Sequence, residues 1–319
     1  MTALTNLFSP YWLGVLLAGS ALVLFSSCAI VISIAARRLD SNAGSLISVA
    51  VNLPVGILLL LLQLAIEGAL APPSLWGIGA FLTAGIFSTY LGRWLFFKSV
   101  ELIGPSRASG FQTSSPLVTA LLGWVLLGEQ LGAMALAGMG LGVMGLIAMS
   151  GGAGRKNAGA SAQRRAHKHL ATRVVLTLGL GASAAYAVSN VLRAAAVREW
   201  NEPVAGATLG ALAGLIVLLT VTGRRLPAIG AAIRAQPASA LMYCGVGAMQ
   251  ITAQTLTIAS MKYIPASLAA LITMCSPLLV VPVSLLFLRQ DEELRPATVA
   301  GILMAIAGVA VVTLYGKLR

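Results

Sequence analysis

The side chains best suited to chemistry in this sequence are polar and basic residues inside long apolar runs. Arg93 lies in one such run, with Thr89 four residues and Tyr90 three residues before it. In a helix this spacing places all three on one face. A charge within an apolar span is costly and usually faces a wet cavity or a partner, so we expect Arg93 to bind a solute carboxylate. The alternative is that its long side chain extends to the membrane surface.

Two further apolar runs carry polar residues at helical spacing. Tyr186, Asn190 and Arg193 form one stripe, and Gln250 and Gln254 form another. We expect these side chains to donate and accept hydrogen bonds in the same binding site as Arg93. For the uncharged residues the alternative is hydrogen bonding between helices.

A third group of polar residues stands beside two prolines in a pair of similar apolar runs. The group comprises Gln112 and Ser115 before Pro116, and Thr273 and Ser276 before Pro277. Because proline removes a backbone hydrogen bond and can kink a helix, we expect the two prolines to act in gating. Taken together, the stripes predict a polar, net-positive cavity for a zwitterionic or anionic small molecule.

An internal repeat relates these runs. Pro116 pairs with Pro277 at an offset of 161 residues, and Glu129 pairs with Glu292 at 163. The repeat predicts an N-terminal half over residues 1–150, a basic flexible linker over 151–173, and a C-terminal half over 174–319. Five spans per half is an odd number, so the second half must enter the membrane in the opposite orientation. We therefore expect two inverted five-helix repeats.

Composition sets the class of protein. The chain has 319 residues, of which 58% are hydrophobic and 9% charged, and a mean hydropathy of +0.91. Soluble domains carry roughly 25% charged residues, so an all-α integral membrane protein is predicted. Ten spans are expected, at about 11–35, 44–66, 74–100, 106–127, 131–149, 174–197, 204–221, 238–263, 266–288 and 297–315.

The basic residues predict orientation rather than nucleic-acid binding. The net charge is +12, and most Lys and Arg residues fall in the linker and in the loops on its side of the membrane. By the positive-inside rule, the linker is expected in the cytoplasm and both termini outside. Gly138 and Gly142 form a small-residue pair that we expect to pack against the chain's own fourth span, about 106–127; a dimer face is the alternative, which leaves a monomer or a homodimer open.

No pattern typical of an enzyme is present. The two histidines, His167 and His169, lie in the linker, and every carboxylate falls at a span end or in a loop. We therefore expect neither catalysis nor a metal or cofactor. Proton coupling in membrane pumps usually needs a carboxylate or histidine at membrane depth, so simple carboxylate-based proton antiport is not expected.

The repeated segment resembles the drug/metabolite transporter superfamily, specifically its EamA-type members. The resemblance rests on Gly104-Pro105-Ser106, Pro116 and Gly128-Glu129-Gln130-Leu131, and on their second copy, Pro265-Ala266-Ser267, Pro277 and Glu292-Glu293-Leu294. It implies a ten-helix transporter of the bacterial inner membrane, often an exporter of amino acids or other small metabolites. Small relatives use a carboxylate in the first helix for proton-coupled drug efflux, and this first span has none.

The sequence therefore predicts an exporter of amino acids or related metabolites that works by alternating access between inverted halves. Two alternatives remain open at this stage. One is a transporter of drugs or lipid-linked substrates, which needs a more apolar cavity and a lateral opening. The other is a membrane scaffold that transports nothing, which predicts no water-accessible cavity.

Overall fold

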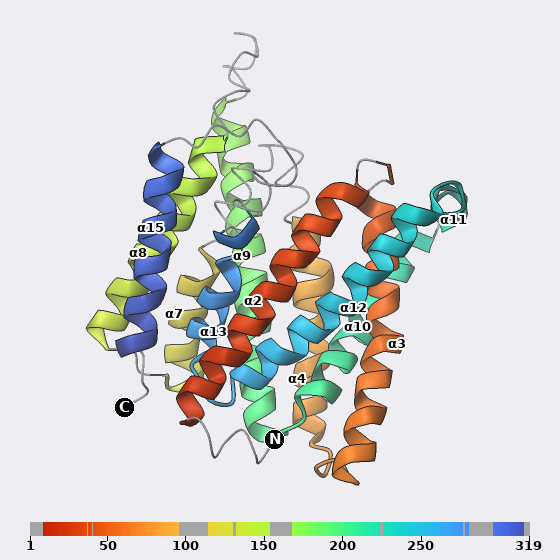
Figure 1. Ribbon diagram of the computed structural model, residues 1–319, viewed down its shortest axis with the longest axis horizontal. Coiled ribbons are helices and arrows are strands. Elements are labelled where there is room, and N and C mark those ends of the chain that lie inside the picture. The colour runs from red at the N-terminus through yellow and green to blue at the C-terminus, as the bar shows by residue number, and fades with distance from the viewer. Residues whose placement is uncertain are drawn as a thin grey trace.

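The computed structural model describes residues 9–315 apart from 37, 40, 96–113, 130–131, 154–167, 224–225, 277 and 281–295, and within this part every regular element is a helix (Figure 1). This confirms the all-α prediction for the described residues. The first half contains α2 (Pro10–Ala35), α3 (Ser41–Glu67), α4 (Leu75–Gly85), the π-helix η1 (Ile86–Gly92), α7 (Ser115–Leu127) and α8 (Ala133–Ala153). The second half contains α9 (Lys168–Glu199), α10 (Pro203–Thr222), α11 (Leu226–Ala235), α12 (Pro237–Ser260), α13 (Ala266–Met274) and α15 (Pro296–Tyr315).

Each of the ten predicted spans contains a described helix. The helix α11 is additional, and its ten residues lie in the connection between α10 and α12. Four helical segments are long and apolar enough to cross a membrane, namely Pro10–Ile32, Ala43–Glu67, Leu75–Leu95 and Pro203–Thr222. Large apolar side chains cover their outer faces; Leu61 and Leu62 of α3, for example, are more than half exposed. Such a surface suits lipid rather than water.

The helices α8 and α15 lie side by side and run in opposite directions (Figure 1). Gly138 of α8 meets Val311 of α15, and Gly145 meets Ala305, so the residue order reverses along the contact. A Cβ atom on Gly145 would lie 2.5 Å from the backbone nitrogen of Ala305, which shows how closely the two backbones approach. The small-residue pair thus packs within the chain, but mainly against its last helix; the expected packing against the fourth span was wrong, because the equivalent glycine-rich helices of the two halves pack on each other.

Packing in one half is repeated in the other with the partners exchanged. In the first contact, the ring of Phe81 on α4 lies over Gly206 of α10; in the second, the ring of Tyr243 on α12 lies over Gly44 of α3. The two rings are 162 residues apart in sequence, and so are the two glycines. In both contacts a Cβ atom on the glycine would lie within 2.5 Å of the ring, so only glycine leaves room for it. The two halves are therefore related by an approximate two-fold rotation.

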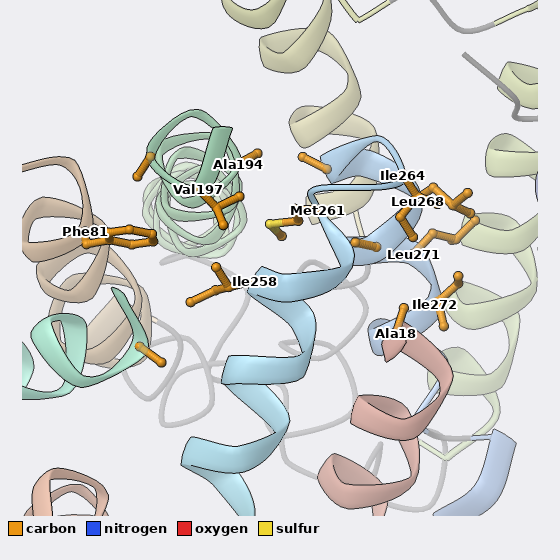
Figure 2. Packing of buried hydrophobic residues seen from close by; sticks show 14 of the residues in the cluster. Ala18, Phe81, Ala194, Val197, Ile258, Met261, Ile264, Leu268, Leu271 and Ile272 are labelled. Carbon is orange, nitrogen blue, oxygen red and sulfur yellow. The ribbon is translucent and has the colours of Figure 1, made fainter. Parts of the chain in front are cut away.

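A hydrophobic core closes the end of the bundle where α9 ends and α13 begins (Figure 2). The cluster contains Val197 of α9, Ile258 of α12, Met261 directly after α12 and Leu268 of α13, all almost completely buried. Phe81 joins the same cluster from α4. Because these residues come from four helices far apart in sequence, their burial fixes the helices relative to one another at this end.

The glycine contact between α8 and α15 gives the first prediction. Gly145→Ala should lower the thermal unfolding midpoint in detergent, because its new methyl group meets the backbone of α15. We expect a cost of about 1–3 kcal/mol from overpacking. The matched control is Gly140→Ala on the same helix, where a Cβ atom meets nothing within 4 Å. Equal midpoints for the two variants would contradict this packing.

Candidate functional site

A polar cavity of about 470 Å³ lies between helices of both halves. It is lined from α2, α3, η1 and the residue that follows it, α9, α12, α13 and the turn after α13. The lining residues are Phe25, Ala29, Asn52, Ser88, Thr89, Arg93, Tyr186, Asn190, Arg193, Gln250, Gln254, Thr257, Thr273, Met274 and Ser276. The size is ordinary for a small-molecule site, since such pockets run from about 300 to 1,000 Å³.

The structure brings together most of the residues singled out from the sequence. Those that line the cavity are Thr89, Arg93, Tyr186, Asn190, Arg193, Gln250, Gln254, Thr273 and Ser276. The structure brings such residues together where positions four apart lie on a regular helix, as in α9 and α12. In these helices the polar stripe and the cavity-facing stripe are the same.

The remaining predicted residues have other places. Ser115 is completely buried at the start of α7, outside the cavity lining, and Pro116 follows it in the first turn of that helix. Gln112 and Pro277 lie outside the described residues. Tyr90 is described and does not line the cavity, because it lies in η1, where i→i+5 hydrogen bonds widen the turn and move a residue three before Arg93 off its face.

Sequence reasoning missed three polar lining residues, Ser88, Asn52 and Thr257. Thr257 stands three residues after Gln254 on α12, so the spacing of that stripe could have found it. The other two were missed for physical reasons. Ser88 stands five residues before Arg93, a spacing that shares a face only in a π-helix. Asn52 is a single polar residue in an otherwise apolar stretch of α3. In the amide orientation that suits its neighbours, Asn52 donates to the carbonyl oxygens of Ser48 and Gly247, at 2.9 and 2.8 Å, and so ties α3 to α12.

Arg193 is held inside the cavity. Its side chain comes from α9 and the residue is only 8% exposed. Its Nη2 donates to the hydroxyl of Ser88 at 2.7 Å. With the amide of Gln254 oriented to satisfy both groups, Gln254 Oε1 accepts from Nη1 at 3.2 Å and also from Nη2. The guanidinium group therefore has fixed neutral partners and does not extend to a helix end.

Arg93, the residue after η1, also lines the cavity. Its Nη1 donates to the hydroxyl of Ser45 on α3. Tyr186 of α9 is close enough to both guanidinium groups to interact with each electrostatically. Among the described lining residues there is no carboxylate to balance the two positive charges. Two fixed cations in a site of low dielectric constant attract an anionic group strongly.

An ion pair between the buried Glu129 and the partly exposed Arg198 lies at the closed end of the bundle. Gly128 ends α7 in the left-handed conformation, with φ of 64°, and the next residue is Glu129. The Oε1 of Glu129 accepts from Nη2 of Arg198, at the end of α9, and from the backbone nitrogen of Ala266 at 3.1 Å, at the start of α13. One carboxylate thus joins the ends of three helices.

A second carboxylate, that of Glu202, links the start of α10 to α3 and to the connection between α3 and α4. Glu202, just before α10, accepts from the backbone nitrogen of Ala71 and from Nε2 of Gln63, both at 2.7 Å. Lys262 lies near it in the turn between α12 and α13. Burial lowers the pKa of Lys262, and the negative charges of Glu202 and Glu67 partly oppose that shift. The closed end therefore combines an apolar core with a rim of charged groups.

Removing the Glu129 carboxylate should loosen this end. Glu129→Ala leaves the Ala266 nitrogen and Arg198 without their acceptor, and should cost about 1–3 kcal/mol of unfolding free energy. Glu129→Gln keeps an acceptor oxygen and should cost less. Glu199→Gln, an exposed carboxylate one residue from Arg198, is the control and should leave the unfolding midpoint unchanged. A Glu129→Ala variant as stable as this control would show that the ion pair contributes nothing.

Comparisons with known proteins now bear on the class of molecule. A search of curated proteins finds no significant match. A solved structure, titled only "Crystal structure of protein", is similar to the chain with a TM-score of 0.69 and 19% identity, over 95% of this chain and 97% of the other. It shows that the same fold has been observed in a crystal. The model of the EamA-like transporter family matches residues 12–151 and again residues 173–314. The chain therefore belongs to the EamA-like transporter family, with two copies of the family's repeat.

Proposed function

We propose that this protein exports amino acids or related small metabolites that carry a carboxylate. Family membership supports a multi-pass membrane transporter of small solutes rather than an enzyme. The observation that carries the finer proposal is the pair of arginines, Arg93 and Arg193, held among neutral polar groups in one cavity. A carboxylate supplies the charge that this site favours, and the cavity volume suits an amino acid.

Each wall of the cavity has a role in this proposal. Arg93 binds the carboxylate, and Tyr186 lines the same cavity near both arginines. The amides of Asn190 and Gln250 offer hydrogen bonds to an amino or polar group of the solute. The remaining hydroxyls, those of Thr89, Thr273 and Ser276, accept and donate further bonds. A substrate without an anionic group suits this site less well, because it would leave the two guanidinium groups without a counter-charge.

Transport would proceed by alternating access between inverted halves. The equivalent helices α8 and α15 run in opposite directions, as two inverted repeats require. In this scheme the structure represents the state in which the end held by Glu129 and the apolar core is closed. In the second state the two halves would exchange their packing, which would open this end and close the opposite end of the bundle. Pro116 lies in the first turn of α7, where proline removes no hydrogen bond within the helix, so it does not kink α7 and a gating role for the two prolines stays a prediction. We place the protein in a bacterial inner membrane, with the linker in the cytoplasm.

Transport in sealed proteoliposomes tests the proposal. A pooled set of amino acids is offered with and without a pH gradient, and the solutes that move are identified. Movement without a gradient supports a facilitative exporter, whereas movement that requires one would show that protons are coupled without a carboxylate at membrane depth. The absence of any movement would contradict amino-acid transport.

The Arg93 variants locate the carboxylate site. Arg93→Gln should raise KM for the transported solute about tenfold or more, because one charge-assisted interaction is worth about 1.5–3 kcal/mol. Arg234→Gln, which removes an exposed cation on α11, is the matched control and should leave KM unchanged. Unaltered kinetics in Arg93→Gln for every solute found would remove Arg93 from the site.

Chemical labelling separates a transporter from a scaffold. On a background without Cys28, Cys244 and Cys275, we expect Gln250→Cys to react with a water-soluble thiol reagent, because Gln250 lines the cavity. The neighbouring residue Ile251 is 0% exposed, so Ile251→Cys should stay unlabelled. Equal protection of both cysteines would mean that water does not reach the cavity, and would favour a scaffold.

A further inference from the structure

The π-helix η1 lies where the two repeats differ in length by one residue. Up to Gly85, residues of α4 match those of α12 at an offset of 162, since Phe81 and Gly85 have the same packing roles as Tyr243 and Gly247. From Arg93 onward the offset is 161, which pairs this residue with Gln254 in the cavity. Between the two anchor points the first half therefore has one residue more. The wide turn of η1 accommodates it.

The contacts on either side of η1, at Gly85 and at Arg93, do not require the extra residue. Gly85 lies against Gly210 of α10, and its counterpart Gly247 lies against Ser48 of α3, again 162 residues apart. In the second half, α12 crosses the equivalent distance as an uninterrupted α-helix. An α-helix one residue shorter could thus connect the same two ends in the first half. The insertion needs another explanation.

The wide turn places Ser88 where it can hold Arg193. The Ser88 hydroxyl donates to the carbonyl oxygen of Ala84 at 3.0 Å and accepts from Arg193 Nη2 at 2.7 Å. The same Ala84 oxygen accepts from the hydroxyl of Ser189 at 2.8 Å. Ser189 and Arg193 are four residues apart on α9, so one face of α9 contacts the turn at two points.

The corresponding part of the other half has none of these features. The position equivalent to Arg193 in α2 is Val31, at the offset of 162. The position equivalent to Ser189 is Ser27, whose hydroxyl donates to Val23 within its own helix at 2.9 Å. The partner helix of α2 is α12, which is regular. The arginine, the interhelical serine contact and the wide turn thus occur together, in one half alone among the described residues.

We propose that the one-residue insertion in η1 serves to make Ser88 the acceptor that orients Arg193 in the cavity, so that Ser88 is a positioning residue for the anionic group of the solute. The contact itself stands on the geometry. Its effect on affinity rests on the proposed function. Ser88 touches the arginine and acts through it.

A double-mutant cycle on thermal stability tests the contact without any substrate. Ser88→Ala should lower the unfolding midpoint by about 2–4 °C, and clearly less in an Arg193→Gln background, because the partner is then already gone. Thr83→Ala on α4, which removes a hydroxyl bonded only to the Gly79 carbonyl of the same helix, is the control and should be equally small in both backgrounds. Additive effects of Ser88→Ala and Arg193→Gln would overturn the inference.

Transport kinetics test the role in recognition. Ser88→Ala should raise KM about tenfold with little change in kcat, since one hydrogen bond to a charged group is lost. Ser88→Thr keeps the hydroxyl and should restore KM. Deleting Ser88 should convert η1 to α-helix, leave the protein folded and reproduce the raised KM. An unchanged KM in Ser88→Ala, or a deletion variant that does not fold, would overturn the inference.

These measurements distinguish a failure of the Ser88–Arg193 inference from a failure of the proposed transport function. A coupled stability cycle supports the Ser88–Arg193 contact even if no solute is moved, and the proposed function alone then fails. Transport that is lost in Arg93→Gln and unaffected in Ser88→Ala supports the proposed function and overturns this inference.

Discussion

A guanidinium group within an apolar helical bundle is the constraint on which this structure depends. Placing such a charge away from water is unfavourable unless polar groups surround it. Arg193 meets this requirement with Ser88 from η1 and Gln254 from α12, so three helices must approach at one point. At the contact between η1 and α9 this approach is aided by Gly92, where a Cβ atom would lie 3.2 Å from the ring of Tyr186. The polar site and the close packing around it are therefore aspects of one arrangement.

The membrane class and the helix positions could be predicted from the sequence because they depend on average properties. A run of about 20 apolar residues specifies a span whatever its neighbours are. The repeat added the number of helices per half, and regular helical spacing placed Asn190 and Arg193 on one face. These inferences succeeded where the backbone is a regular α-helix. The family match and the described helices agree with them.

The site was less predictable where the backbone departs from that regularity. Spacing in an α-helix predicts that Tyr90 lines the cavity and Ser88 does not, and the structure shows the reverse. The reason is that η1 has more residues per turn than an α-helix. Asn52 was missed because one polar residue in an apolar run has no periodicity to detect. The amphipathic helix α11 was missed because ten residues between two spans resemble a loop. In each case the residue's position depends on the local backbone or on its neighbours in space, which the residue pattern does not show.

The two halves have nearly the same packing and different chemistry, and the difference is what a transporter needs. The ring-over-glycine contacts recur at the same offset, which makes two states related by exchanging the halves similar in energy. A binding site with the same symmetry would offer the solute two equivalent orientations. Here the counterpart of Arg93 is Gln254, and the counterpart of Arg193 is the apolar Val31. The extra residue in η1 breaks the symmetry at the cavity and leaves it intact at the packing contacts on either side.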